Sequence, residues 1–386
     1  MSESVKQLLI PNYSEPTFAV NFYKIARPSA ENVTDPFTNK IFKTNGLNCW
    51  KITDGNLQKF SKDKIEIFFD AECYLVQWQF DLKVDNTVFE EMLVYYWKGL
   101  NANKGPSPLP PEIEDTCPVE RVVQYSEPAI FFYTFPNRFV VFAGKENNFN
   151  SDAPHLLLIR GELEQEIHLY EVPCKRESLR TRAVFLLVLP REQRFIYWQG
   201  KHVDSEHKNR VLEIVQPHKI LCRLQKNWTI FSTDQTLENK EPLYFKEAVV
   251  GEAHCELTLY NHPYTPRLFY LNSITGTFLA TEIEYPLRAK NHIAPYPFLQ
   301  SHLYTATQPA LFVLDNYSEV WLWEGPADLE QIVNYEEELR MANEFVIDYI
   351  KSRSLEIGKN IQLKRAKAGD EPLEFTLLFP FWIDSN

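Results

Sequence analysis

Residues 183–200 read AVFLLVLPREQRFIYWQG, an apolar run followed by an aromatic run that ends in Trp198-Gln199-Gly200. The same pair of runs occurs earlier, before Trp97-Lys98-Gly99, and later, before Trp323-Glu324-Gly325. Continuous runs of aliphatic, β-branched and aromatic residues of this length are typical of strands that are buried on both faces. The pattern therefore predicts two successive strands that are repeated three times along the chain.

A second anchor follows each Trp-x-Gly. It has the pattern Glu-Pro-x-x-Phe, as in Glu127-Pro128-x-x-Phe131, Glu241-Pro242-x-x-Phe245 and Glu371-Pro372-x-x-Phe375. Both anchors recur in the same order with a period of roughly 100 residues or more, which is the size of a domain rather than of a solenoid unit. We therefore expect three tandem domains of one kind.

A helix is expected between the two anchors of the third unit and of the second. In the third unit, apolar residues recur at helical spacing and predict a long amphipathic helix that begins near Pro326. Its apolar face would consist of Leu329, Ile332, Val333, Leu339, Val346 and Ile350. In the second unit, the apolar residues from Val203 to Val215 predict a helix of about four turns, which Pro217 ends.

The first unit differs from the other two. The segment Gly105-Pro106-Ser107-Pro108-Leu109-Pro110-Pro111 lies between its anchors and is incompatible with the interior of a long helix. We therefore expect this unit to have lost most of its helix. Residues 1–45 are polar, are interrupted by prolines and are expected to form an irregular N-terminal extension. The units themselves are expected at 46–150, 154–262 and 265–386.

The composition excludes several classes of protein. Of 386 residues, 44% are hydrophobic and 24% are charged, which indicates a folded globular chain. The formal charge of −12 argues against a nucleic-acid partner. The 6 cysteines contain no C-x-x-C pair, so a zinc ribbon is not supported. The N-terminal residues lack a secretory leader pattern and no apolar stretch reaches membrane-span length, which predicts a cytoplasmic protein.

The arrangement of strands, Trp-x-Gly, helix and Glu-Pro resembles the gelsolin/villin superfamily over residues 46–386. Several segments are similar to the supervillin subfamily: Ser178-Leu179-Arg180-Thr181-Arg182, Pro266-Arg267-Leu268-Phe269, Ala280-Thr281-Glu282, Pro297-Phe298-Leu299-Gln300, Gln308-Pro309-Ala310-Leu311-Phe312 and Glu371-Pro372-Leu373-Glu374-Phe375-Thr376. The resemblance implies an α+β fold of three gelsolin-like domains, each a mixed sheet sandwiched between a long and a short helix. They would correspond to the fourth, fifth and sixth repeats of that superfamily.

The resemblance also implies calcium sites, which we compare position by position. The superfamily binds Ca²⁺ through a glycine carbonyl, an aspartate of the strand and a glutamate of the long helix, all hard oxygen ligands. In the first unit Ala71 and Glu72 match the glycine and the aspartate, and we interpret them as a vestigial calcium site. In the second unit Arg182 stands where the aspartate is expected, and in the third Pro309-Ala310 supplies no carboxylate. No other cofactor is expected.

A basic segment of the third unit, with Lys364, Arg365 and Lys367, is similar to the stretches by which gelsolin relatives contact phosphoinositides. Each cation would contribute about 1 kcal/mol near an anionic surface. A solvated basic strand is the alternative interpretation of the same residues. If the lipid interpretation holds, the expected location includes the membrane-associated cell cortex as well as the cytoskeleton.

The resemblance implies a non-enzymatic module of the actin cytoskeleton, with F-actin or actin-associated proteins as partners. The sequence contains no Gly-rich phosphate loop, nucleophile elbow or metalloprotease helix that would support catalysis. Because the calcium residues are altered, calcium-driven severing of filaments is not expected. Two alternatives stay open: filament binding and capping under calcium or phosphoinositide control, and a scaffold whose partners are not actin.

Overall fold

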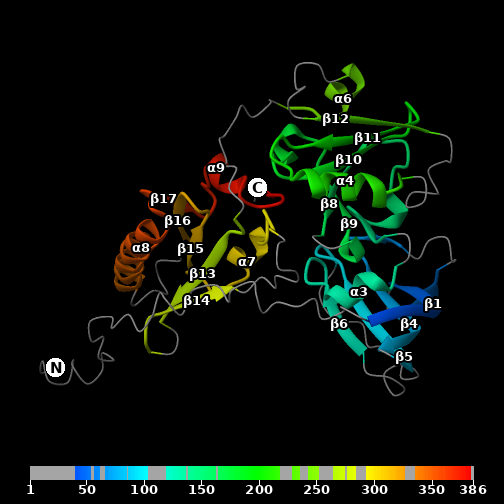
Figure 1. Cartoon of the computed structure of the whole chain (residues 1–386), viewed down its shortest axis with the longest axis horizontal. Helices are drawn as coiled ribbons and strands as arrows, with labels where there is room; N and C mark the ends of the chain where they lie inside the picture. The colour runs from blue at the N-terminus through cyan, green and yellow to red at the C-terminus, as the bar shows by residue number, and fades with distance from the viewer. Residues whose placement is uncertain are drawn as a thin grey trace, which may run out of the picture. The chain divides into compact units, whose positions relative to one another are not determined.

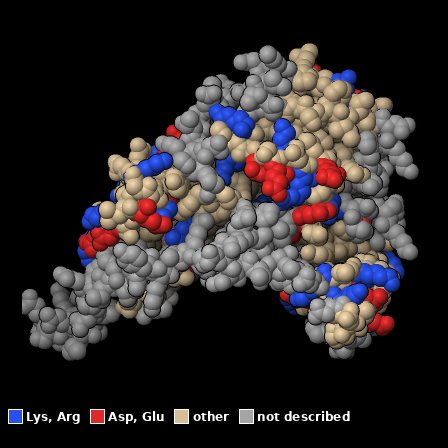
Figure 2. All heavy atoms as spheres, viewed as in Figure 1, with Lys and Arg blue, Asp and Glu red and all other residues tan. Residues whose placement is uncertain are grey.

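The computed structural model describes residues 40–53, 56–60, 66–84, 86–102, 119–135, 138–161, 164–217, 228–234, 242–251, 264–273, 276–283, 293–326 and 335–383 (Figure 1; Figure 2). Their elements are strands, short helices and one long helix, which confirms the predicted α+β class. The described residues from 35 to 255 form one compact unit, and those from 256 onward form another. We describe each unit by itself.

The described strands form three sheets that contain the same five-strand order. In the first sheet the order is β2 (Asn56–Lys59), β1 (Lys40–Thr53), β4 (Cys73–Val84), β5 (Thr87–Lys98) and β6 (Val119–Val123). The second sheet has β9 (His168–Val172), β8 (His155–Arg160), β10 (Val184–Leu189), β11 (Arg194–Gln199) and β12 (Thr229–Asp234). The third has β14 (Leu279–Ile283), β13 (Arg267–Asn272), β15 (Leu311–Asp315), β16 (Glu319–Glu324) and β17 (Gln362–Lys367).

In every sheet the predicted apolar strand pairs antiparallel with the Trp-x-Gly strand, which pairs in parallel with the last strand. The apolar strand lies in the middle of each sheet, with a hydrogen-bonded strand on either side. All of β10 and all of β15 are buried, as expected from their uninterrupted apolar sequences. The repeat read in the sequence is therefore a repeat of sheet topology.

The long helix of the third sheet is α8 (Tyr335–Ile357). Its apolar face, with Phe345 and Val346, packs on Val313 and Leu322 of the sheet. The opposite face of the same sheet is covered by α7 (Gln300–Tyr304) and α9 (Leu373–Thr376). The third sheet is therefore sandwiched between a long and a short helix, as predicted. The predicted helix start near Pro326 borders residues 327–334, which lie outside the described part of the chain.

The second sheet carries a shorter helix, α4 (Ser205–Ile214), whose Val211 is buried in the core of that sheet. It begins at Asp204, whose side chain accepts a hydrogen bond from the amide of His207, and it stops before Pro217. Its 10 residues make fewer than the four turns that were predicted, because the helix begins only after Val203. In the first unit, the prolines from Pro106 to Pro111 lie outside the described residues.

Each Glu-Pro anchor starts a short helix: α3 (Ala129–Tyr133), α6 (Leu243–Ala248) and α9. The phenylalanine of each anchor is fully buried. In the first and third units the tryptophan of Trp-x-Gly donates its indole Nε1–H to the glutamate, with Trp97 to Glu127 Oε1 and Trp323 to Glu371 Oε1 both at 2.9 Å. The two sequence anchors are therefore joined by one hydrogen bond. Glu241, the glutamate of the second unit, lies outside the described residues.

Two features of the first unit differ from expectation. β1 begins at Lys40, inside the segment 1–45 that was expected to be irregular, because the last proline of that segment is Pro36 and nothing after it breaks a strand. In addition, β3 (Ile67–Phe69) and β7 (Val140–Phe142) pair in parallel and extend the second sheet beyond β9. Strands from the predicted first unit thus belong to the sheet of the second. The unit boundaries at 150 and 154 stay a prediction.

Candidate functional site

The glycine of each Trp-x-Gly fixes the segment in which a calcium site was predicted. The amides of these glycines donate to the carbonyls of Glu72, Ala183 and Ala310 at 3.0, 3.0 and 2.8 Å. A Cβ atom on Gly99 would lie 2.1 Å from the carbonyl oxygen of Asp70, and one on Gly200 would lie 2.2 Å from that of Thr181. Only glycine permits this approach, so the glycine aligns the same backbone position in all three units.

This alignment corrects one prediction. The residue of the second unit that occupies the position of Glu72 is Ala183, because its carbonyl accepts the equivalent glycine amide. Arg182 therefore corresponds to Ala71, not to Glu72. The sequence comparison assigned Arg182 to the position of Glu72, one residue too far along, because no glycine marks the turn of this unit. In the third unit the equivalent residue is Ala310, as predicted. Neither alanine offers a carboxylate.

Glu72 lies within a small buried ion cluster. Its Oε2 accepts a hydrogen bond from the hydroxyl of Tyr74 at 2.6 Å, and its Oε1 lies 3.4 Å from Nζ of Lys51. The same Nζ lies 3.0 Å from Oε2 of Glu146, in the 3₁₀ turn Glu146–Asn148. The side chains of Lys51 and Glu72 are only 8% and 10% exposed. One ammonium group therefore sits between two carboxylates that are distant in sequence.

The oxygens of Glu72 already have partners within the chain. A Ca²⁺ ion requires six to eight oxygen ligands at about 2.3–2.6 Å, and an ammonium group in the same place repels it and offers no lone pair. The hydroxyl of Tyr74 and the amide of Glu146 also donate to Glu72. Within the described part of the chain, no group of three or more His, Cys, Asp or Glu side chains converges as a metal site would require. Ala71 contributes an amide that donates to the carbonyl of Gly144 at 3.0 Å.

Asp70, next to this cluster, holds the turn in place. Its Oδ1 accepts the amide of Gly144 at 2.7 Å and its Oδ2 accepts the side-chain amide of Asn101 at 2.9 Å. Partial burial raises the pKa of Asp70 above its usual value. Its carboxylate thus joins the segments around residues 70, 101 and 144, and its oxygens are taken up by these donors.

The predicted phosphoinositide residues lie on β17, but they do not all point to the same face of the sheet, because successive side chains of a strand alternate between its faces. Lys364 is opposite Trp321 and lies over its ring, on the face covered by α9. Arg365 and Lys367 are on the other face, where Arg365 donates to the side chain of Asn343 of α8 at 2.5 Å. Each cation also has a carboxylate within 4.0 Å: Glu319 for Lys364, and Glu324 for the other two. The structure therefore does not bring the three cations together.

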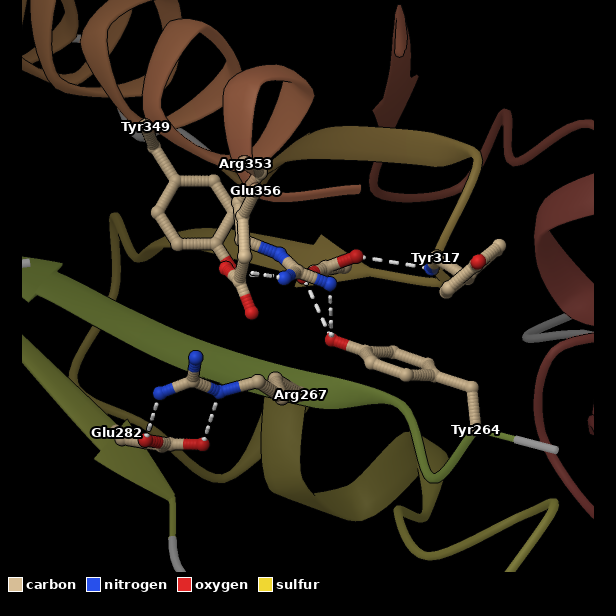
Figure 3. A network of polar contacts seen from close by, with 8 residues as sticks. Tyr264, Arg267, Glu282, Tyr317, Tyr349, Arg353 and Glu356 are labelled. Carbon is tan, nitrogen blue, oxygen red and sulfur yellow. Dashed lines mark hydrogen bonds and ion pairs between the residues drawn. The ribbon is translucent and has the colours of Figure 1, made fainter. Parts of the chain in front are cut away.

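A buried polar network in the third unit was not predicted. Asp315, at the end of β15, is fully buried, and its Oδ2 accepts hydrogen bonds from Tyr264 at 2.7 Å, Tyr349 at 2.6 Å and Arg353 Nε at 3.1 Å (Figure 3). Its Oδ1 accepts the amide of Tyr317 at 2.8 Å. Burial raises the pKa of Tyr349 well above its usual value. The network ties the start of the third unit to α8.

The clusters around Lys51 and Asp315 were not predicted, although the sequence contains a weak indication of each. Lys51 stands between the apolar residues Trp50 and Ile52 and is itself buried, where an unpaired charge would be costly. Asp315 ends an apolar run in the same way. Such residues indicate that a partner exists, but the sequence does not identify the partner, which lies 95 residues away for Lys51 and Glu146.

Comparison with known proteins gives the family. Supervillin from Bos taurus is 31% identical over 379 residues, which covers 87% of this chain and 17% of supervillin. This chain belongs to the gelsolin/villin superfamily. Its three sheets are those of three gelsolin-like domains. Other similar proteins are villidin from Dictyostelium discoideum, 23% identical over 91% of this chain and 20% of villidin, and a cytoplasmic gelsolin from Halocynthia roretzi, 24% identical over 86% of this chain and 43% of that protein.

Other comparisons add little to this gelsolin/villin assignment. No protein-family model matches the chain. A solved structure, the Thorarchaeota 2DGel3/rabbit actin complex, aligns with 53% of this chain and 100% of its own at 19% identity and a TM-score of 0.20, which is too low to compare individual elements. The gelsolin/villin chain described here spans about a sixth of the length of supervillin. Among its described helices, none combines the length and the apolar character needed to cross a membrane.

Proposed function

We propose that this chain is a non-enzymatic interaction module of the actin cytoskeleton, which contacts actin filaments or actin-associated proteins in the cytoplasm without control by calcium. Its place in the gelsolin/villin superfamily supports the actin part of this proposal. The similarity to supervillin extends over 87% of this chain but only 17% of supervillin, so the proposal concerns this module alone.

The position of Lys51 carries the calcium part of the proposal. Its ammonium group lies 3.4 Å from Glu72 and 3.0 Å from Glu146, and so neutralises the carboxylate that corresponds to the calcium ligand. A cation that belongs to the chain is present at every calcium concentration. The contact between the turn before β4 that holds Glu72 and the turn that holds Glu146 is therefore made without metal, whereas a calcium-regulated domain would make it only with the ion bound.

The alternatives receive less support from the described residues. Control by phosphoinositide would use Lys364, Arg365 and Lys367 together, but Lys364 lies on the opposite face of β17 from the other two. A scaffold for partners other than actin has the same architecture as an actin-binding module. The partner must therefore be tested directly.

The test is sedimentation of the chain with F-actin, in about 1 mM Ca²⁺ and in chelator, alongside thermal unfolding under both conditions. We expect sedimentation in both and an unchanged midpoint, because a ligand that does not bind the folded state cannot stabilise it. A midpoint that rises by several degrees with Ca²⁺ would overturn the calcium part. A chain that never sediments with actin would overturn direct binding to filaments and leave binding to actin-associated proteins or the scaffold.

Substitution of Lys51 tests the explanation itself. Lys51→Gln leaves Glu72 and Glu146 without their shared cation, and we expect a loss of about 3 kcal/mol in the free energy of unfolding, because one partner of a buried ion pair has been removed. Added Ca²⁺ should restore part of this loss in Lys51→Gln but have no effect on the parent chain. Lys43→Gln, on the same strand with a side chain that is 76% exposed, is the matched control and should behave like the parent.

A further inference from the structure

The first sheet carries an extension that the other two lack. β1, β4 and β5 have 14, 12 and 12 residues, whereas the equivalent strands of the second sheet have 6 each and those of the third have 6, 5 and 6. The additional residues form a three-stranded ribbon, which we define as residues 40–48, 77–84 and 87–93 (blue to cyan in Figure 1). The other two sheets form the same five-strand order without such a ribbon.

The ribbon is rigid at its base. Trp78 is fully buried and stacks on Phe80 at 3.8 Å between ring centroids, and Phe42 packs on both rings at 5.8 and 5.7 Å. Tyr133 of α3 contacts Phe42 at 4.9 Å. A strand that is already held in an extended conformation costs little further entropy when it receives a partner.

One edge of the ribbon is open in the described part of the chain. β6 pairs with β5 only from Val94 to Lys98, so residues 87–93 of β5 have β4 on one side and no described strand on the other. Val84 pairs with Thr87 at the hairpin, and the alternation of antiparallel pairs then directs the N–H and C=O groups of Val88 and Glu90 away from β4. Such groups are a template for another strand.

The side chains of residues 87–93 indicate which kind of strand this edge binds. All five residues from 87 to 91 are exposed, with Val88 at 56% and Phe89 at 47%. Successive residues point to opposite faces, so Glu90 and Glu91 place a carboxylate on each face. Antiparallel pairing of two copies of β5 centred on Glu90 or on Glu91 would set glutamate against glutamate, which is destabilising.

We propose that residues 87–93 of β5 bind an extended basic segment of a partner protein, which adds to the first sheet as a sixth strand. Main-chain hydrogen bonds from Val88 and Glu90 would give the affinity, and Glu90 and Glu91 would select lysine or arginine at the facing positions. Residues 87–93 do not include the Lys51 cluster, on which the calcium part of the proposed function rests. Binding of a basic segment at this edge therefore does not depend on the proposed function, nor on whether the chain binds actin.

The test uses the whole chain and a labelled peptide, acetyl-Thr-Thr-Val-Lys-Arg-Val-Thr-amide, whose adjacent Lys and Arg point to opposite faces of an added strand, with binding followed by fluorescence anisotropy. Val88→Pro removes one outward amide without removing a bond to β4, and should weaken binding by about tenfold or more. The double variant Glu90→Lys/Glu91→Lys keeps the backbone and should reverse the preference, so that it binds the peptide with Glu in place of Lys and Arg. Thermal unfolding of both variants confirms that they fold.

Three outcomes would overturn the proposal. The first is that the parent chain does not bind the basic peptide, and the second is that Val88→Pro binds it as well as the parent, which would indicate surface attraction without strand addition. The third is concentration-dependent association of the parent chain in sedimentation velocity that Val88→Pro abolishes. That result would assign the edge to a second copy of this chain.

Discussion

Glu127 connects the first and second sheets, because its carboxylate accepts hydrogen bonds from a side chain of each. Its carboxylate is 8% exposed and accepts hydrogen bonds from Trp97 of β5 at 2.9 Å and from the hydroxyl of Tyr170 of β9 at 3.0 Å. Burial raises the pKa of Glu127 to about 7, although these donors and the nearby Arg160 favour the ionised form. A proton on this carboxylate therefore affects the contact between two sheets.

The pH dependence of stability follows from this shift. Between the ordinary pKa of 4.5 and about 7, the folded chain binds more protons than the unfolded chain, so the free energy of unfolding falls as pH rises through this window, by about 3 kcal/mol. Glu127→Gln should remove this slope, and denaturant unfolding from pH 4.5 to 8 would measure it. Glu120→Gln, at an exposed glutamate of β6, is the control and should keep the slope. An unchanged slope in Glu127→Gln would contradict the assignment.

At the scale of elements, the Trp–Glu hydrogen bond attaches the short helices α3 and α9 to their sheets. Trp323→Phe removes the bond to Glu371, which is half-buried and still accepts a hydrogen bond from Tyr304, and should cost about 2 kcal/mol in addition to lost packing, because the acceptor is charged. Trp321→Phe is the matched control, because the Nε1–H of buried Trp321 has no partner within the described residues. Chemical denaturation of both variants compares the two losses, and equal losses would contradict a role for the bond.

The sequence predicted strands where the pattern was local. The apolar run at 183–189 became β10 (Val184–Leu189), because strand burial is a property of a short segment. The helix that starts at every Glu-Pro anchor was not predicted from the anchor itself, although proline is common at a helix N-terminus. The division of Lys364 from Arg365 and Lys367 could also have been predicted, since a period of two separates neighbours on a strand. The beginning of β1 at Lys40 could not, because a polar strand lacks an apolar signal.

At the scale of the whole molecule, β3 and β7 make the first two sheets interdependent. Phe68 of β3 is fully buried among Tyr74, Trp97 and Phe139 of the first core, while its strand pairs with β7 of the second sheet. Phe68→Ala should therefore destabilise residues 35–255 as one body by about 3–5 kcal/mol. Hydrogen exchange should increase together in peptides of both sheets, and faster exchange confined to the first sheet would contradict the prediction.

The matched variant for this test is Phe345→Ala. Phe345 is a fully buried residue of α8 in the core of the third sheet, and its loss should increase exchange only from residue 256 onward. The sequence did not predict this division of the chain. Ile67 to Phe69 is an apolar run that would suit either sheet, and the choice of partner depends on a pairing with residues 140–142, which no local pattern encodes.

The indole of Trp97 has a further consequence because its nitrogen points at Glu127. In the excited state of an indole, electron density moves away from the five-membered ring, so a negative charge next to that nitrogen lowers the energy of the emitting state. Ionisation of Glu127 should therefore move the emission of Trp97 to longer wavelength. The chain would then carry its own optical reporter of a single proton, readable without any label.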